Sequence, residues 1–233
     1  SNYLVCSDQS SSVDITIEKQ LDFTGATFNV VDSICGDLIT PTIWGDLFQG
    51  VQNIPNGAYE VTYTITGVPL PITTTQNFIG GKMQLPIPSS NFSGVGSYTI
   101  TITNIVSTSS LGICNNIIGS IFDVFHINPI PKINNATLTI VPVCQTFDAL
   151  VNFSGTSNLT NGNYDIVYNI SGVNTAVAIP SVLSITGGLG SFAIPKALIP
   201  NVGTSTITIT QITNTATGCT NTSALNEQFT VNP

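Results

Sequence analysis

Alternation of apolar and polar residues is the strongest pattern along this chain. In the stretch NGAYEVTYTITGV (56–68), every second side chain from Tyr59 to Ile65 is apolar and the side chains between them are polar. The stretch NGNYDIVYNISGV (161–173) repeats this alternation from Tyr164, with one apolar exception on its outer face. A period of two residues predicts β-strands that bury one face and expose the other. No segment sustains helical periodicity between helix caps, so the pattern predicts an all-β protein.

These two stretches belong to a longer internal repeat. The segment GGKMQLPIP (80–88) matches GGLGSFAIP (187–195), and VGSYTITIT (95–103) matches VGTSTITIT (202–210). Matched positions lie 105 to 107 residues apart in all of these pairs. A unit of about a hundred residues has the size of an immunoglobulin-like β-sandwich. We therefore expect tandem immunoglobulin-like β-sandwich domains arranged end to end.

Prolines mark the boundary between the two units. The segment HINPIPKINN contains Pro129 and Pro131, which favour a short, stiff joint with few ladder hydrogen bonds. We place repeat 1 at residues 23–130 and repeat 2 at residues 131–233. Residues 1–22 resemble the end of a repeat, with a cysteine, a polar loop and an alternating strand, so they predict the C-terminal strand of a truncated preceding repeat. On this interpretation the natural protein extends beyond the sequence.

Composition narrows the classes of partner. The chain is 42% hydrophobic, which suffices for real cores, but only 7% charged, with four lysines, no arginine and a formal charge of −8. It therefore lacks the basic surface that nucleic acids require, and the basic clusters that anionic membranes recruit. No apolar run is long enough to insert into a membrane. The polar residues are mostly Thr, Ser and Asn, which suit strand faces and turns.

The order of the motifs resembles a known family. Each unit has a cysteine after its first strand (Cys35, Cys144), a G-x-Y-x-V/I-x-Y-x-I-x-G strand, an LPIP or FAIP segment, a TITIT strand, and a GIC or TGC turn (Cys114, Cys219). This order resembles the tandem repeats of giant gliding-motility-type surface adhesins of the Bacteroidota. The resemblance covers nearly the whole chain, although these units are longer than the repeats typical of the gliding adhesin. It implies an extracellular, cell-surface filament exported by the type IX secretion route.

Five cysteines in a Thr-rich chain of extracellular character predict disulfides. One scheme pairs residues within each repeat, as Cys35–Cys114 and Cys144–Cys219, and leaves Cys6 unpaired. This scheme requires a short or kinked first strand, because a seven-residue strand spans roughly 23 Å whereas bridged Cα atoms lie within about 7 Å. The other scheme joins neighbouring repeats through Cys35 and Cys219, and the remaining cysteines await repeats outside this sequence. Reduced, buried thiols are a third alternative, so the connectivity stays open.

No catalytic residue stands out. His126 is the one histidine, and the repeat puts Thr230 in its place, so we expect a surface histidine rather than a catalytic one. Serines occur without a G-x-S-x-G elbow. The GG pairs at 80–81 and 187–188 precede strands, which favours hairpin turns over phosphate-binding loops. We therefore expect a protein that is not an enzyme.

Trp44, in the segment TIWGDLF, is the one tryptophan. We interpret it as a plug of the core, with a carbohydrate-stacking platform as the alternative. The second repeat has no aromatic residue in register with it, which weakens the idea of a repeated sugar site.

Acidic residues are scattered rather than clustered. No D-x-[DN]-x-[DN]-G loop occurs, so no cofactor is expected. Structural calcium at a domain joint, held by Asp22, Asp32 or Asp37, is a weaker alternative to simple solubilising charges. The segment DSI, with Ser33 at its centre, fits the short O-glycan motif that the resemblance implies for this phylum.

Together these patterns predict a non-enzymatic structural and adhesive segment of a long extracellular filamentous repeat protein. Its expected partners are neighbouring repeats of the same chain and a polysaccharide or another surface ligand. Two other classes remain as hypotheses, a carbohydrate-binding or spacer module of a secreted hydrolase, and an enzyme domain. Neither is favoured, because no histidine or carboxylate recurs at matching loop positions of the two repeats.

Overall fold

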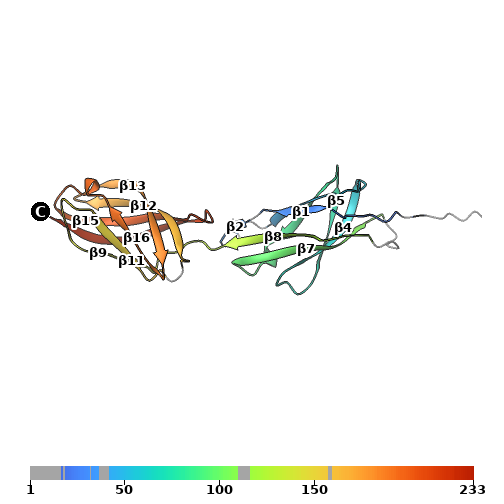
Figure 1. Cartoon of the computed structure of the whole chain (residues 1–233), viewed down its shortest axis with the longest axis horizontal. Coiled ribbons are helices and arrows are strands. Elements are labelled where there is room, and N and C mark those ends of the chain that lie inside the picture. The colour runs from blue at the N-terminus through green and yellow to red at the C-terminus, as the bar shows by residue number, and fades with distance from the viewer. Residues whose placement is uncertain (1–16, 18, 32, 37–41, 110–115, 157–158) are drawn as a thin grey trace, which may run out of the picture. The chain divides into compact units, whose positions relative to one another are not determined.

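Strands make up nearly all of the regular structure. The computed structural model describes residues 17, 19–31, 33–36, 42–109, 116–156 and 159–233 (Figure 1). Among them, the helical turns are two short 3-10 segments, η1 (Ser89–Asn91) and η2 (Lys196–Leu198). The prediction of an all-β protein is confirmed.

The first sandwich contains two sheets. One has the strand order β1 (Thr27–Val30), β3 (Thr42–Phe48), β6 (Lys82–Pro88). The other has the order β2 (Ser33–Cys35), β8 (Ile121–Asn128), β7 (Gly96–Ser107), β4 (Gly57–Ile65), β5 (Ile72–Phe78). Strand β2 runs parallel to β8, whereas β4 runs antiparallel to both β5 and β7. Two such sheets packed over one core form an immunoglobulin-like β-sandwich.

The second sandwich repeats this order as one continuous ladder. Its strands follow the order β10 (Val143–Cys144), β16 (Thr220–Asn232), β15 (Gly203–Asn214), β12 (Gly162–Gly172), β13 (Ala176–Thr186), β14 (Leu189–Ile194), β11 (Ala149–Ser154), β9 (Thr137–Ile140). Strand β13 pairs with β12 and, at its end, with β14, so it connects the two layers. The corresponding connection in the first sandwich is a single described bridge, between Ile79 and Lys82.

A glycine accompanies this difference between the sandwiches. Gly190 of β14 lies so close to β13 that an added Cβ would sit 2.8 Å from the Ser184 carbonyl oxygen. The matching residue of β6 is Met83, whose side chain is buried in the first core. The second sandwich thus has a glycine at the closest approach of these strands, where the first has a buried methionine.

By compactness the chain divides into two units. One comprises residues 1–30, 44–87 and 99–123, and the other comprises residues 31–43, 88–98 and 124–233. Strands β7 and β8 run through this division, so we use the hydrogen-bonded sheets to define the two sandwiches and describe each one by itself. The predicted domain boundaries remain predictions.

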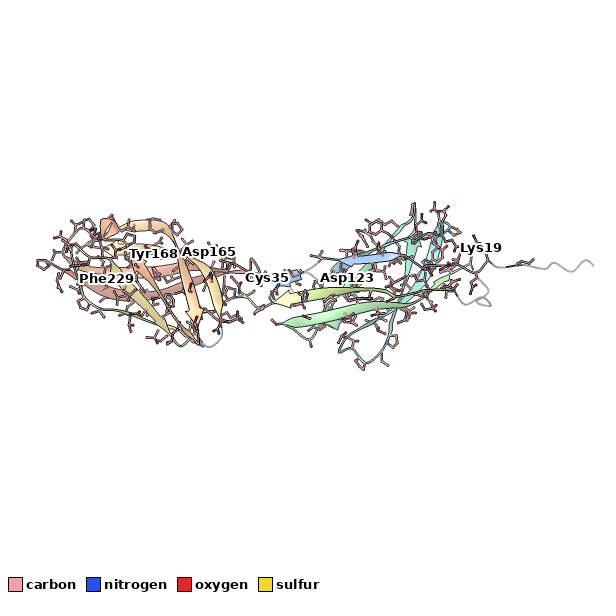
Figure 2. The ribbon with its side chains drawn as sticks, in the orientation of Figure 1. Lys19, Cys35, Asp123, Asp165, Tyr168 and Phe229 are labelled. Carbon is pink, nitrogen blue, oxygen red and sulfur yellow. A yellow bond between two sulfur atoms is a disulfide. The ribbon has the colours of Figure 1, made fainter. Side chains whose placement is uncertain are left out.

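Alternation along the strands builds both cores. In β4 the inward residues from Tyr59 to Ile65 are at most 2% exposed, and in β12 those from Tyr164 to Ile170 are at most 3% exposed. Figure 2 labels Tyr168 and Phe229 of the second core, which are both buried. The strand faces predicted from the period of two residues are therefore confirmed.

The repeated NG dipeptide has a structural role that the sequence reasoning missed. The Asn56 side-chain oxygen accepts a hydrogen bond of 2.9 Å from the Gly80 backbone amide. Asn161 accepts the same bond, also 2.9 Å, from Gly187. Both glycines begin a GG turn in which the two φ angles are positive, as a tight hairpin turn requires. The asparagine thus ties the start of one strand to a turn far along the chain.

The last threonine of each TITIT segment marks a β-bulge. The register shifts between Thr62 and Tyr63 in the first sandwich, and between Val167 and Tyr168 in the second. The extra residue donates its hydroxyl to a carbonyl across the ladder, from Thr103 to Thr62 and from Thr210 to Val167, at 3.1 Å in both cases. Both copies of the repeat therefore have the same β-bulge and the same hydrogen bond across it.

The two sandwiches secure the start of β7 and β15 differently. The Tyr98 hydroxyl donates to the Gly94 carbonyl at 2.8 Å, the arrangement known as a tyrosine corner. The matching residue of the second sandwich is Ser205, whose hydroxyl accepts bonds from the Asn174 backbone amide at 3.0 Å and side-chain amide at 3.2 Å. Both residues of this second pair are at most 2% exposed.

Most of the proposed strand of a preceding repeat lies outside the described residues. The described part of residues 1–22 includes Leu21, which is 7% exposed, and Phe23 follows it with no exposure. Their backbones exchange hydrogen bonds of 2.7 and 2.9 Å with Ile117. These residues therefore pack with the first sandwich.

Candidate functional site

A disulfide joins Cys35, which is labelled in Figure 2, to Cys219, and the two are separated by 184 positions in the sequence. Cys35 ends β2 and pairs with Asn128 at the end of β8, whereas Cys219 immediately precedes β16. The Cα atoms of the two cysteines lie 5.4 Å apart. The bond therefore links a strand of the first sandwich to the second sandwich, which is the pairing between neighbouring repeats that the sequence left open.

The pairing within each repeat is wrong for this structure. Cys35 and Cys219 are bonded to one another, so neither Cys35–Cys114 nor Cys144–Cys219 forms. The geometry explains why. Cys144 pairs with Asn232 at the end of β16, and Cys219 precedes the beginning of this 13-residue strand. At about 3.3 Å per residue the two cysteines are separated by roughly 40 Å. Cys6 and Cys114 lie outside the described residues.

Further contacts flank the disulfide. The Gly36 amide donates to the Asn128 carbonyl at 2.7 Å, and the Asn221 side chain donates to the Pro131 carbonyl at 2.9 Å. Gly36 has a φ of +66°, and an added Cβ would overlap the Ile130 side chain. Residues close in sequence to each bonded cysteine therefore contact the segment 128–131.

Cys144 occupies the place in the second sandwich that Cys35 occupies in the first. Each pairs with the last residue of a parallel strand, Asn232 or Asn128. The next backbone amide in each case donates to that same residue, at 2.9 Å from Gln145 and 2.7 Å from Gly36. Cys144 is exposed and carries a free thiol. One of the two equivalent cysteines is therefore bonded and the other is not.

The prediction that Trp44 fills the core is wrong. Trp44 lies on the outer face of β3, where it marks a second candidate site. It is 50% exposed, because Ile43 and Leu47 of the same strand point inward and Trp44 falls on the alternate face. The ladder registers place Leu150, which is 53% exposed, at the matching position of β11. The position faces outward in both sandwiches, and only the first has an aromatic residue there.

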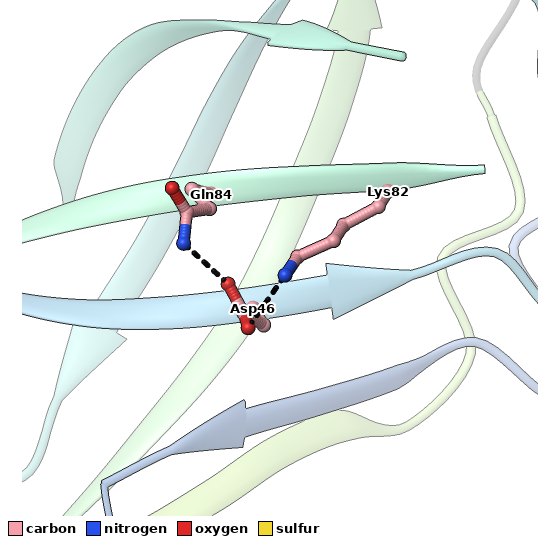
Figure 3. Close-up of polar contacts among 3 residues, drawn as sticks. All are labelled: Asp46, Lys82 and Gln84. Carbon is pink, nitrogen blue, oxygen red and sulfur yellow. Dashed lines mark hydrogen bonds and ion pairs between the residues drawn. The ribbon is translucent and has the colours of Figure 1, made fainter. Parts of the chain in front are cut away.

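A fixed ion pair lies on the same face as Trp44. The Lys82 ammonium approaches the Asp46 carboxylate to 2.8 Å, and the Gln84 side chain donates to that carboxylate at 3.0 Å (Figure 3). The Lys82 ammonium also lies 5.2 Å from the centre of the Phe48 ring. The hydrogen bond from Lys82, together with that from Gln84, lowers the pKa of Asp46 against the opposing effect of partial burial.

These residues line a shallow hollow of about 420 Å³ with amide groups at its edge. Its lining residues are Trp44, Gln76, Asn77, Ile79, Lys82 and Gln84. An equivalent hollow of about 470 Å³ on the second sandwich has the lining residues Asn152, Phe153, Ser154, Ser184, Thr186, Leu189, Gly190 and Ser191. The repeat offset matches Lys82 with Leu189 and Gln84 with Ser191. The second hollow thus has neither a tryptophan nor an ion pair.

His126 is exposed on β8, as predicted. Its Nδ1 atom lies 2.8 Å from the Ser97 hydroxyl oxygen on the neighbouring strand. In the second sandwich Thr204 and Thr230 pair at these positions. We interpret the His126–Ser97 contact as a cross-strand hydrogen bond on an open sheet surface.

The remaining candidates rest on residues that are partly undescribed. Hydrogen bonding from the Thr24 side chain, and then from the Thr24 backbone amide at 2.8 Å, lowers the pKa of Asp22. Asp32 and Asp37, the other proposed calcium ligands, lie outside the described residues. Among the residues that are described, no group of three or more His, Cys, Asp or Glu side chains gathers as a metal site would require. Ser33 is exposed at the start of β2. Its assignment as a glycan site stays a prediction.

In the described part of the chain, no helix has the length and apolar character needed to cross a membrane.

Comparison with known proteins gives distant similarities. No protein-family model and no curated protein matches the chain. Among solved structures it is similar to the chicken CNTN1 FN1–FN3 domains, at a TM-score of 0.42 and 9% identity, over 92% of this chain and 65% of that one. It is also similar to Salmonella alpha-2-macroglobulin (TM-score 0.32, 11% identity, 91% of this chain and 15% of that one). A third is the calcium-binding domain CBD12 of CALX1.1 (TM-score 0.30, 9% identity, 82% and 81%).

The chain spans less than two thirds of the length of the first two structures. TM-scores this low do not identify a family or a function. The assignment of β-sandwiches therefore rests on the hydrogen-bonded sheets of this chain.

Proposed function

We propose that this chain is a non-enzymatic structural and adhesive segment of a long extracellular repeat protein. The observation that carries the proposal is the Cys35–Cys219 disulfide, which links two copies of one scaffold alongside their short connection. Disulfides persist in oxidising, extracellular compartments. A covalent link between modules limits how far they separate, which suits a protein built to reach outward from a cell.

The resemblance in motif order supports a narrower assignment. It favours a cell-surface adhesin of the gliding-motility type, exported by the type IX route and displayed as a filament. Neighbouring repeats would then be its first partners. Cys144 supports this view, because it offers the position of Cys35 to a cysteine that precedes the last strand of another repeat.

Localisation on intact cells tests this function directly. Antibodies raised against residues 23–233 should label long filaments on the surface of cells of the source organism in immunogold microscopy. If the antibodies instead detected only a soluble hydrolase in the culture medium, the proposal would be contradicted. A panel of common hydrolase substrates should show no turnover; turnover abolished by one serine or carboxylate substitution would contradict the non-enzymatic assignment.

Peptide mapping without reduction tests the link itself. We expect a Cys35–Cys219 peptide, and alkylation of Cys144 by a thiol reagent without denaturant. Cys35→Ser should abolish the linked peptide, whereas the matched control Cys144→Ser should leave it intact. A Cys144–Cys219 peptide in the wild-type chain would refute the link between neighbours.

A further inference from the structure

We propose that the hollow beside Trp44 binds a neutral, hydroxyl-rich glycan through a hexopyranose ring stacked on the indole. This inference rests on the adhesive role proposed above and names the class of ligand and its site. The outward-facing hollow exists in both sandwiches, and only the first has a tryptophan and an ion pair there. The hollow itself is therefore a feature of the shared scaffold, whereas the tryptophan and the ion pair are specific to the first sandwich.

The indole provides the stacking surface. Trp44 leaves half of its area in water although it is the largest apolar side chain available. The face of an aromatic ring carries negative charge from its π-system and attracts positively polarised edges. The C–H groups on the flat side of a pyranose present such edges over an area similar to the indole. Leu150, at the same position of the second sandwich, has no flat face to offer.

The rim of the hollow supplies polar partners of both kinds. Gln76, Asn77 and Gln84 line it, and each amide has both a donor and an acceptor. The Asn77 side chain has no hydrogen-bond partner among the described residues and is exposed. A sugar hydroxyl both donates and accepts, so vicinal hydroxyls match a rim of amides. The hollow, at about 420 Å³, lies in the size range of small-molecule sites.

Charge at the hollow favours a neutral ligand. The Lys82 ammonium is occupied by Asp46 at 2.8 Å, so the pair offers fixed hydrogen-bonding groups with little net charge. Asp46 is held in turn by Gln84 at 3.0 Å, which fixes the direction of the carboxylate (Figure 3). The chain as a whole has a formal charge of −8 and no arginine, which disfavours sulfated or uronic polysaccharides.

Trp44 reports on its own site, because it is the one tryptophan of the chain. The intact 233-residue chain is titrated with neutral gluco-, manno- and galacto-oligosaccharides and with chitin oligosaccharides, while tryptophan emission is recorded. At least one neutral probe should shift or quench the emission saturably at millimolar concentration or below. Sulfated and uronic counterparts should bind at least tenfold more weakly. No response to any neutral probe, or preference for the anionic ones, would overturn the proposal.

The repeat supplies matched variants. Trp44→Leu installs the residue of the second sandwich and should weaken binding at least tenfold in calorimetry, whereas Leu150→Ala should leave it unchanged. Circular dichroism should show both variants folded. Trp44→Phe, which keeps a smaller ring, should retain part of the affinity. Equal binding by the wild type and Trp44→Leu would overturn the proposal.

A second copy of the chain is the competing occupant of the hollow. Sedimentation that shows concentration-dependent dimers, lost in Trp44→Leu, together with no glycan response, would assign the hollow to self-association. Failure of the glycan site is distinguishable from failure of the proposed function, because immunogold labelling and the Cys35–Cys219 peptide do not depend on Trp44.

Discussion

Gly45 leaves room for the Phe28 ring in the first sandwich, whereas the second sandwich has Val151 and Leu138 at these two positions. A small residue faces a large one in one core, and two middle-sized residues meet in the other. Each pair contributes seven side-chain carbon atoms, and the scaffold is the same. The two sandwiches thus show which features the fold requires, because they reach one architecture through different side chains.

The largest expected effect comes from exchanging these core pairs. Gly45→Val should destabilise the first sandwich by about 3 kcal/mol, because the new side chain overlaps Phe28 in a closely packed core. Adding Phe28→Leu should recover a substantial part of the loss. Urea unfolding followed by Trp44 emission measures both variants, since that tryptophan belongs to the first sandwich.

The mirrored exchange is the control for this prediction. Val151→Gly should be destabilising by itself and partly rescued by Leu138→Phe, as judged by circular dichroism. If the double variants are no more stable than the singles, the two cores do not compensate in the way their register suggests.

A smaller loss of stability should distinguish the hydrogen bonds that hold the start of β7 from those that hold the start of β15. Ser205→Ala removes the acceptor for two donors of Asn174 in a buried site and should cost about 2 kcal/mol. Tyr98→Phe removes one hydroxyl that is close to the surface and should cost about 1 kcal/mol. Thermal unfolding should therefore show the larger loss of Tm for Ser205→Ala. The reverse order would mean that the tyrosine corner stabilises its sandwich more than the buried pair does.

The smallest effect concerns pH. The pKa of Asp46 lies below its ordinary value of 3.8 because Lys82 and Gln84 bind the charged form. Its contribution is therefore present above pH 4 and is lost as pH falls through the lowered pKa. The Asp46 side chain is 32% exposed, so we expect less than about 1 kcal/mol.

Asp46→Asn should remove this part of the acid sensitivity when unfolding free energies at pH 5 and pH 2.5 are compared. Asn152→Asp is the matched variant of the second sandwich, where Leu189 replaces the lysine. It should not acquire the same dependence on pH, and an equal acquired dependence would show that the lysine is not its source.

The strands were predictable because their signal is local. A period of two residues assigns Tyr59 and Tyr164 to the cores without any knowledge of what packs on them. The partners of the repeated asparagines were not predictable, because Asn56 bonds to Gly80 across 24 positions that no local pattern connects. A search for polar residues repeated with the same spacing to a repeated glycine would have identified the bond.

Trp44 shows a different limit of the sequence. Its segment TIWGDLF contains apolar residues on both faces of the strand, so the pattern did not decide which face is inward, and a large aromatic residue suggested the core. The inward face carries Ile43, Gly45 and Leu47, and Gly45 leaves space there for Phe28 from another strand. The disulfide was likewise left open, because the choice depends on where the strand ends lie in three dimensions.

The disulfide also determines the path along which tension travels. A pull on the two ends of this chain passes from Cys35 through the sulfur bridge to Cys219, and the residues between them carry no load. Most of both sandwiches lies in that shielded loop of 184 positions, whereas β1, β2 and β16 lie outside it. Reduction of the one bond would expose the shielded strands to the load, and their unfolding would then release a contour length of roughly 600 Å. The oxidation state of a single cysteine pair therefore decides whether this part of the chain behaves as a nearly inextensible link or as a long extensible tether.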